Sequence, residues 1–307
     1  MLSIISAICY VLLGYTVPRE NFTAVATLYL IPFVATYLTY RLVDEKHQVL
    51  WLLEAAIFFR ALLLFCEPAL SDDYLRFIWD GQLSTHGINP FGKLPSEIPD
   101  GEQYALSDQM YNLVTEKDYY SIYPPICQYI FYLAVQVFPG SISSSVLVMK
   151  IFILLFEAGS LYLMYRLVQR LRIPLKLCLL YALNPLVIVE LSGNLHFEAA
   201  MIFFTLLAIW ALWEKNRFVF SAIAFGGAIA SKLLPILLLV FFFKRLGFFR
   251  TLYYSAIAFT TAFLLYLPFD ILNIYENIFE SARLYFQTFE FNASIYYICL
   301  LYTSPSP

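Results

Sequence analysis

The polar interval of this chain opens with Ser71-Asp72-Asp73-Tyr74-Leu75-Arg76-Phe77-Ile78-Trp79-Asp80-Gly81 and closes with Tyr123-Pro124-Pro125. On both sides of it the sequence consists of long apolar runs joined by short connectors. An otherwise apolar chain that keeps one large acidic segment is expected to use that segment. We therefore predict that residues 71–125 form a catalytic loop at a membrane surface.

The composition is that of an integral membrane protein. Of the 307 residues, 61% are hydrophobic and only 13% are charged, whereas soluble domains carry about 25% charged residues. The net charge of −3 provides no basic field for nucleic acid. The five cysteines lie in apolar runs without a C-x-x-C pair, and the three histidines are scattered. These residues are therefore interpreted as buried hydrophobes and isolated polar groups rather than metal ligands.

The apolar runs predict transmembrane helices, because a bilayer core leaves no other way to satisfy backbone N–H and C=O groups. The expected fold is an all-α polytopic bundle with interfacial amphipathic helices in its large external loop. It comprises three N-terminal helices in residues 1–70, the catalytic loop 71–125, and the remaining helices of the same membrane domain in 126–301. The expected spans are Leu2–Val17, Phe22–Tyr40, Val49–Leu70, Val146–Val168, Pro174–Val189, Phe197–Trp213, Phe218–Phe243, Phe248–Leu267 and a last one from near Ala293.

Basic residues predict the orientation, since Lys and Arg accumulate in cytoplasmic loops. Four basic clusters lie in residues 41–46, 166–176, 215–217 and 244–250. Placing all four in the cytoplasm puts residues 71–125, 190–198 and 270–292 outside. This solution requires that 126–138 does not cross the membrane. It also requires that 218–243 is a broken hairpin with Ser231-Lys232 at its outer tip, for which Gly226-Gly227 and Pro235 supply the break.

The last six residues, 302–307, read Tyr-Thr-Ser-Pro-Ser-Pro and depart abruptly from the preceding apolar run. We expect this tail to be non-native and the native C-terminus to be truncated, with the chain continuing beyond Leu301.

The segment 71–81 predicts an amphipathic helix with Ser71 or Asp72 as its N-cap. Helical spacing puts Leu75, Ile78 and Trp79 on one face and Asp73, Arg76 and Asp80 on another. We expect it to lie in the interface with Trp79 toward lipid and the carboxylates toward water. The alternative is a capped surface helix with a solvated charged face. Adjacent acids point apart on a helix, so a divalent metal at Asp72 and Asp73 is possible but not favoured.

Three further positions carry polar groups at membrane boundaries. The prolines after Tyr123 can hold its ring rigidly. A simple turn, in which prolines are common, explains them equally well. His196 and Glu198 lie between two spans, where a plain solvated loop is the alternative. Lys232 interrupts a long apolar run; at the tip of a broken hairpin it is a cation suited to a phosphate, and snorkelling without function is the alternative.

The ordered set of these motifs resembles the GT-C superfamily of membrane glycosyltransferases, most closely the bacterial polyprenol-phosphate-mannose-dependent mannosyltransferases. The likeness rests on Ser-Asp-Asp-x-x-Arg-Phe-x-Trp-Asp-Gly from Ser71, Gly-x-Asn-Pro-Phe from Gly87, and Tyr-Pro-Pro from Tyr123. It extends to Ala-Leu-Asn-Pro-Leu from Ala182, Gly-Asn-x-His-x-Glu from Gly193, and Ser-Lys-Leu-Leu-Pro from Ser231.

The resemblance implies a multi-pass enzyme of the bacterial inner membrane that uses no cofactor. It would transfer a mannose-like sugar from a polyprenyl-phosphate donor to a glycan, glycolipid or protein acceptor at the external face. By position Asp72 is the expected catalytic base, with Asp73 as its neighbour. Inversion at C1 is expected because one carboxylate acts at the reaction centre. The expected donor- and phosphate-binding residues are Arg76, Tyr123, His196, Glu198 and Lys232.

Two other functions fit the sequence less well. A transporter or flippase for a lipid-linked or anionic solute would show inverted repeats and polar groups at mid-membrane, whereas the acids of this chain cluster outside its apolar runs. A non-catalytic membrane scaffold would not need polar residues gathered on one side. The enzyme hypothesis requires Asp72, His196 and Lys232 to converge at the outer interface.

Overall fold

The computed structural model describes residues 1–98, 108–115, 117–213, 215–270, 275–277, 279–281 and 283. Within these residues the chain is built from helices and contains no strand. Three helices are long and apolar enough to cross a membrane: α2 (Phe22–Leu42), α7 (Ile142–Leu171), and α13 (Phe248–Tyr266) with the turn that follows it. A bent helix pair supplies a fourth candidate. The predicted all-α polytopic membrane fold is confirmed.

The N-terminal unit consists of α1 (Leu2–Tyr15), α2 (Phe22–Leu42) and α3 (Lys46–Leu62). Asn21 caps α2 by accepting a hydrogen bond from the N–H of Ala24. The predicted span Val49–Leu70 is wrong at its end, because α3 ends at Leu62. The ammonium of Lys150 from α7 donates to the carbonyl of Leu63 at 2.8 Å and so satisfies a group that another helical turn would have used.

The polar interval contains α4 (Asp73–Thr85), the 3-10 turn η1 (Pro95–Glu97) and α5 (Asp108–Leu113), and is followed by α6 (Pro125–Val137). The expected orientation of α4 is wrong. Trp79 and Asp80 are fully buried and Arg76 is 7% exposed, because α4 packs against α6 rather than lying between lipid and water. The contact is close at Gly81, where a Cβ would come within 2.6 Å of the Phe131 carbonyl oxygen.

Helix α6 is short, and its length limits what it can do. Its 13 residues extend about 20 Å at 1.5 Å per residue, less than the ~30 Å hydrocarbon core. This agrees with the expectation that 126–138 does not cross. The chain then turns into α7 (Ile142–Leu171), the longest helix of the described part.

The segment after α7, where one span was expected over Pro174–Val189, is a bent pair of helices that is a candidate for one broken span. It consists of η3 (Leu175–Cys178), α8 (Leu179–Ala182), α9 (Pro185–Val187) and η4 (Ile188–Gly193), a π-helix. The two halves meet at 49°. Pro185 begins a new helix, and the Asn184 side chain caps it by accepting the N–H of Leu186 at 3.0 Å.

The second helical unit contains α10 (Glu198–Trp213), α11 (Phe218–Ile229), η5 (Leu234–Leu238), α12 (Leu239–Leu246), α13 (Phe248–Tyr266) and η6 (Leu267–Phe269). The apolar run 218–243 is broken, as predicted, with α11 ending at Ile229 and Lys232 in the interruption. Gly226 lets α11 approach α13 closely, since a Cβ there would lie 2.6 Å from the Ala258 carbonyl oxygen.

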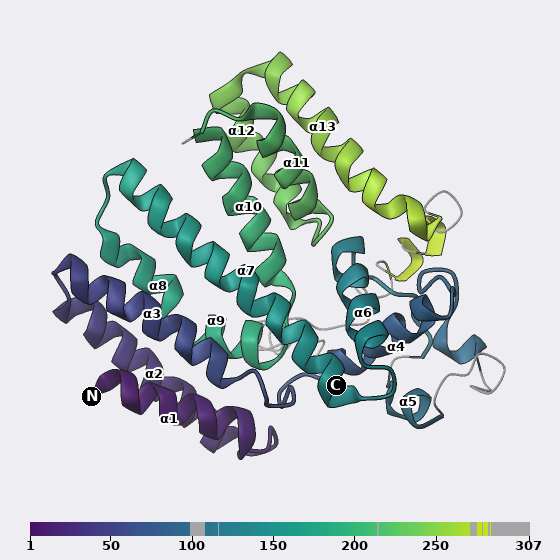
Figure 1. Ribbon diagram of the computed structural model, residues 1–307, viewed down its shortest axis with the longest axis horizontal. Helices are drawn as coiled ribbons and strands as arrows, with labels where there is room; N and C mark the ends of the chain where they lie inside the picture. The colour runs from purple at the N-terminus through teal and green to yellow at the C-terminus, as the bar shows by residue number, and fades with distance from the viewer. Residues whose placement is uncertain are drawn as a thin grey trace, which may run out of the picture.

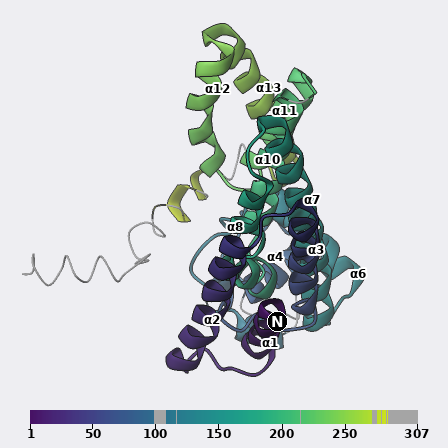
Figure 2. The ribbon, with the colours of Figure 1, turned by 90° about the vertical axis from the view of Figure 1, so that its left-hand side faces the viewer.

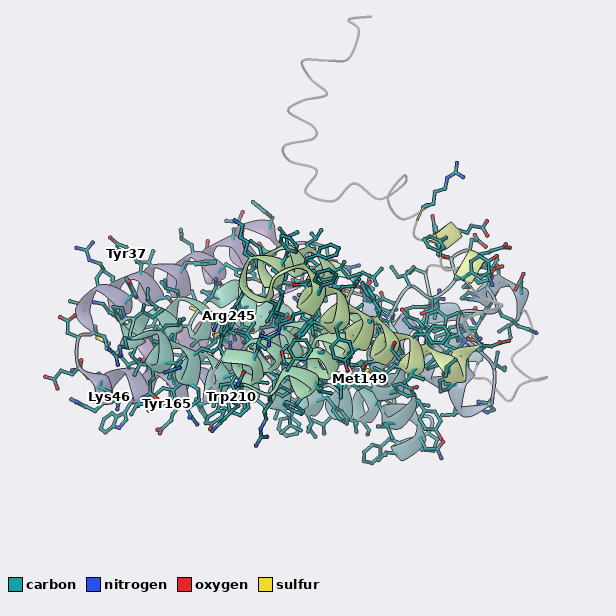
Figure 3. The ribbon with its side chains drawn as sticks, turned by 90° about the horizontal axis from the view of Figure 1, so that it is seen from above. Tyr37, Lys46, Met149, Tyr165, Trp210 and Arg245 are labelled. Carbon is teal, nitrogen blue, oxygen red and sulfur yellow. The ribbon has the colours of Figure 1, made fainter. Side chains whose placement is uncertain are left out.

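The arrangement separates the basic connections from the acidic loop. In Figure 1 the connections α2–α3, α7–η3, α10–α11 and α12–α13 lie along the upper left margin, opposite α4, α5 and α6. Figure 2 shows the second helical unit standing above the N-terminal one. In Figure 3 Lys46 and Tyr37 lie toward the end remote from α4–α6. The basic clusters therefore share one side, as the predicted orientation requires. The span expected from near Ala293 and the tail 302–307 lie outside the described residues.

Candidate functional site

The acid pair lies where the chain enters α4. Asp72 is the N-cap residue and Asp73 begins the helix, and the backbone N–H of Asp73 points to the Ser71 hydroxyl oxygen at 3.4 Å. Asp72 Oδ2 accepts a hydrogen bond from Arg19 Nη1 at 2.7 Å, with both side chains 47% exposed. Arg19, in the α1–α2 connection, was not predicted; a lone arginine in a short connector gives no signal of its partner.

The two carboxylates have different surroundings. Asp72 is accessible, whereas burial raises the pKa of Asp73 above its ordinary value. The His196 side chain and the Ser71 hydroxyl act in the opposite direction on the pKa of Asp73, and the negative charges of Glu198 and Asp72 raise it further. Asp73 therefore lies within electrostatic reach of two residues that are more than 120 positions away in sequence.

Lys232 reaches the same place from the break in the second helical unit. Its ammonium forms an ion pair with Glu198, the first residue of α10, with side chains 49% and 38% exposed. The break is held against the end of the acidic loop, since the N–H of Ile126 donates to the Ala230 carbonyl at 3.2 Å. Lys232 is thus paired with Glu198, and Glu198 and His196 lie within electrostatic reach of Asp73, while the roles expected of these residues stay predictions.

His196 lies in the turn between η4 and α10. Its Nδ1 is 3.5 Å from Glu190 Oε2, a carboxylate that the sequence interpretation did not single out. The neighbouring Asn194 side chain accepts the N–H of Leu70 at 3.1 Å, which ties this turn to the residue before Ser71. The sequence feature that could have identified Glu190 is an acidic residue at the end of an apolar run.

Arg76 belongs to a buried polar network inside the loop. Its Nε donates to Asp80 Oδ1 at 2.9 Å, while Asp80 Oδ2 accepts from the Ser121 hydroxyl at 2.5 Å and from Gln128 Nε2 at 2.9 Å. This network joins α4, the end of the loop and α6. The burial of Asp80 thereby has a structural explanation.

A cavity of about 190 Å³ adjoins the acid pair. Its lining consists of Asp72, Asp73, Leu75, Arg76, Val114 and Thr115. Four polar side chains thus surround a space open to a ligand's polar groups. His196, Glu198 and Lys232 do not line it, so the structure places them beside the acid pair but not around this cavity.

Two motifs of the loop are used for packing. The Tyr123 ring packs edge-on against Phe77, with centroids 4.7 Å apart, beside the buried core of α4 and α6. The Asn89 side chain donates to the Phe269 carbonyl at 2.6 Å, and Phe91 packs on the Phe269 ring. The Gly-x-Asn-Pro-Phe motif therefore docks the loop onto the end of α13.

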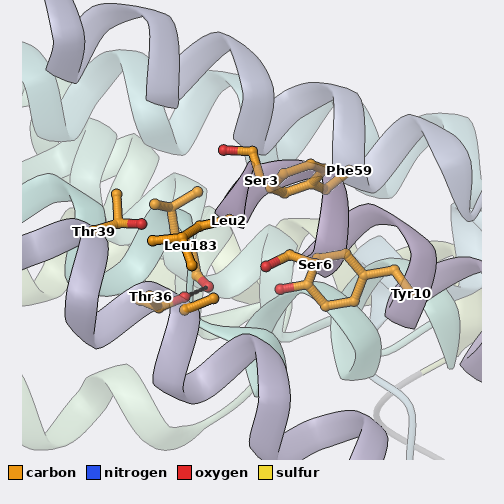
Figure 4. Close-up of a pocket in the computed structure, with 9 residues that line it drawn as sticks. Leu2, Ser3, Ser6, Tyr10, Thr36, Thr39, Phe59 and Leu183 are labelled. Atoms are coloured by element: carbon orange, nitrogen blue, oxygen red, sulfur yellow. Dashed lines mark hydrogen bonds between the residues drawn. The ribbon is translucent and has the colours of Figure 1, made fainter.

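A second polar cavity lies within the N-terminal unit (Figure 4). Its volume is about 10 Å³, and Ser6, Tyr10, Thr36 and Leu183 contribute to its lining. This is room for about one water, and none of its lining residues is charged, so it does not fit a sugar phosphate.

Within the described ranges no three His, Cys, Asp or Glu side chains form a group that could hold a metal ion. In the acid pair, Asp72 is engaged by Arg19. A reaction without a metal remains a prediction.

Comparison with known proteins gives one match. Residues 6–246 match the family described as "Alpha-(1->6)-mannopyranosyltransferase, N-terminal domain". No curated protein and no solved structure matches the chain. The matched range includes the acid pair, the η4–α10 turn and the broken hairpin, which are the segments that converge in the structure. The chain therefore belongs to the alpha-(1->6)-mannopyranosyltransferase family and is a membrane glycosyltransferase.

Proposed function

We propose that the chain is an inverting GT-C-type mannosyltransferase that takes mannose from a polyprenyl-phosphate donor at the external face of the bacterial inner membrane. The acceptor is a glycan, glycolipid or protein hydroxyl. One observation supports the proposal: three distant segments are linked, because His196 and Glu198 lie within electrostatic reach of Asp73 and Lys232 pairs with Glu198. A carboxylate pair beside a cation suits transfer from a phosphate leaving group.

In the proposed reaction the acceptor hydroxyl oxygen attacks C1 of the sugar. A new C1–O bond forms as the bond from C1 to the donor phosphate oxygen breaks, and the acceptor proton passes to a carboxylate. Asp72 is the proposed base, because it is accessible and lines the cavity. Asp73, which is more buried, orients the acceptor beside it. One carboxylate at C1 gives inversion.

The leaving polyprenyl phosphate departs with the bonding electron pair, so its negative charge grows during the reaction. Lys232 is the proposed cation that stabilises this charge. Its present partner, Glu198, holds the ammonium at the site until a phosphate oxygen replaces the carboxylate. Arg76 lines the same cavity as Asp72 and supplies a second positive charge. His196 and Tyr123 are the proposed contacts to the sugar.

The test compares donors and acid variants in membranes that contain the full chain. Radiolabelled polyprenyl-phosphate mannose and GDP-mannose are supplied separately to wild type, Asp72→Asn and Asp73→Asn at matched protein levels. We expect transfer from the lipid-linked donor and a loss of about 100-fold or more in Asp72→Asn. A loss of transfer confined to Asp73→Asn would assign the role of base to Asp73 instead of Asp72. Transfer from GDP-mannose alone, or from neither donor, would overturn the proposal.

A further inference from the structure

Glu190 contacts His196 in two ways. Its Oε2 lies 3.5 Å from His196 Nδ1, and both side chains are 29% exposed. The backbone N–H of His196 also donates to the Glu190 carbonyl oxygen at 3.3 Å. The backbone bond fixes His196 in the turn, and the Glu190 carboxylate lies beside its ring.

Glu190 is itself held in place by two other elements. Its Oε1 accepts a hydrogen bond from the Tyr29 hydroxyl of α2 at 2.7 Å, and its Oε2 accepts one from Asn194 Nδ2 at 3.1 Å. Both carboxylate oxygens are therefore engaged. Asn194 in turn accepts the N–H of Leu70, so the same cluster holds the chain that leads into the acid pair.

The backbone around this cluster is unusual. Glu190 lies in the π-helix η4, a conformation that is rare and often found at functional sites. Leu195, between Asn194 and His196, has a φ of +64° and is fully buried. A left-handed conformation at a residue other than glycine is strained and persists where its surroundings impose it.

We infer that Glu190 is a positioning residue for His196, an inference that rests on the proposed function. Its carboxylate lies at ion-pair distance from Nδ1 of the imidazole, favours a proton on that nitrogen and so sets the orientation of the ring. Nε2 is then the ring nitrogen left for the donor's sugar or phosphate. A carboxylate that sets the tautomer of a neighbouring histidine is a recurring arrangement. Tyr29 keeps Glu190 in that geometry from the N-terminal unit.

The first test is a double-mutant cycle in the transfer assay. Glu190→Gln keeps the size of the side chain but removes the anionic acceptor, and we expect kcat to fall by up to about 100-fold. Combined with His196→Asn it should cause no further loss, because both changes disable one unit. Glu67→Gln is the matched control, since Glu67 also accepts a hydroxyl hydrogen bond, from Ser143 at 3.1 Å. Wild-type transfer by Glu190→Gln, or additive losses in the double variant, would overturn the inference.

A second test does not depend on transfer. The chain has three histidines, so ¹⁵N-histidine NMR of the purified protein in detergent, with His196→Asn as the reference, identifies the His196 signals. We expect a proton on Nδ1 in wild type and a shift of the His196 signals in Glu190→Gln. Tyr29→Phe, which retains the carboxylate, should give a smaller shift in the same direction.

The two proposals fail in different ways. Unchanged His196 signals in Glu190→Gln overturn the positioning role, whatever the transfer assay shows. Failure of wild type to use a lipid-linked donor overturns the proposed reaction alone, because the NMR signals are recorded without donor.

Discussion

At the residue scale the acid pair shows how adjacent identical side chains acquire different properties. At the helix start Asp72 pairs with Arg19, whereas Asp73 lies in the fields of His196 and Glu198, which act on its pKa in opposite directions. Burial raises the pKa of Asp73, so its ionised form is less favourable in the folded protein than in the unfolded chain. The same side chain is therefore accessible at Asp72, the proposed base, and sheltered at Asp73.

This difference predicts the effect of pH on stability in Asp73→Asn. An acid with a raised folded-state pKa adds stability in its protonated form, and that contribution is lost as pH rises through the folded-state pKa. The asparagine variant should therefore unfold at a higher temperature than wild type near pH 7. The difference should shrink as pH falls below the ordinary range of an aspartate. Thermal unfolding in detergent over a pH series measures this; a variant less stable than wild type near pH 7 would contradict it.

The ion pair between Lys232 and Glu198 gives a second prediction at this scale. In Glu198→Gln the ammonium no longer has an anionic partner, so a polyprenyl phosphate should bind more tightly. The gain should be up to about fivefold, because a partly exposed pair contributes about 1 kcal/mol at most. Inhibition of transfer by added polyprenyl phosphate measures it, with Lys232→Gln expected to bind more weakly. Weaker inhibition of Glu198→Gln would show that Glu198 itself binds the donor.

At the element scale the site depends on the packing of α4 against α6. The two helices share a buried core that includes Phe77, Trp79 and Phe131, and the Phe77 and Phe131 rings stack at 4.6 Å. The polar network of Asp80, Ser121 and Gln128 joins the same elements. The position of the acid pair at the start of α4 follows from this packing.

Gly81→Ala tests that dependence. The added Cβ would come within 2.6 Å of the Phe131 carbonyl oxygen, and the backbone there has no room to yield. We expect a loss of about 1–3 kcal/mol from overpacking, together with reduced transfer. Gly92→Ala is the matched control, since its Cβ would meet Asn89 at an ordinary 3.5 Å. Equal unfolding temperatures for the two variants, measured in one detergent, would refute the close contact.

At the scale of the whole molecule, buried charges join the helical segments that carry the site. Arg60 of α3 pairs with Glu157 of α7 at 2.8 Å, with both side chains fully buried. Glu157 also accepts from the Tyr181 hydroxyl, and Arg60 donates to the Ala182 carbonyl at 2.8 Å. Three segments are thereby fixed together away from the loop.

Breaking this pair should destabilise the fold strongly. Arg60→Met leaves Glu157 buried without its cation, and the expected cost is about 3–5 kcal/mol. The double variant Arg60→Met with Glu157→Met should recover much of it. Asp44→Asn, which removes the exposed pair to Lys176, should cost less than about 1 kcal/mol. Urea unfolding in detergent compares the three; a double variant no more stable than Arg60→Met would contradict a coupled pair.

The fold was largely predictable because its determinants are local. Apolar runs predict helices, and Pro235 with Gly226-Gly227 predicts the break that holds Lys232. The orientation of α4 was not predictable, because Trp79 and Asp80 fit an interfacial helix and a buried helix equally well. Their burial depends on α6 and Ser121. Glu190 and Arg19 were missed for the same reason: the roles of both depend on partners distant in sequence, His196 and Asp72. A local pattern does not encode those contacts.

We propose that the acid pair and Lys232 act together in transfer from a lipid-linked donor. The most direct measurement is transfer from radiolabelled polyprenyl-phosphate mannose by wild type, the double variant Asp72→Asn with Asp73→Asn, and Lys232→Gln. Lys176→Gln serves as a control on the opposite side of the molecule. We predict losses of about 100-fold or more in the double variant and in Lys232→Gln, with the control near wild type. Transfer at the wild-type rate by the double variant would contradict the account.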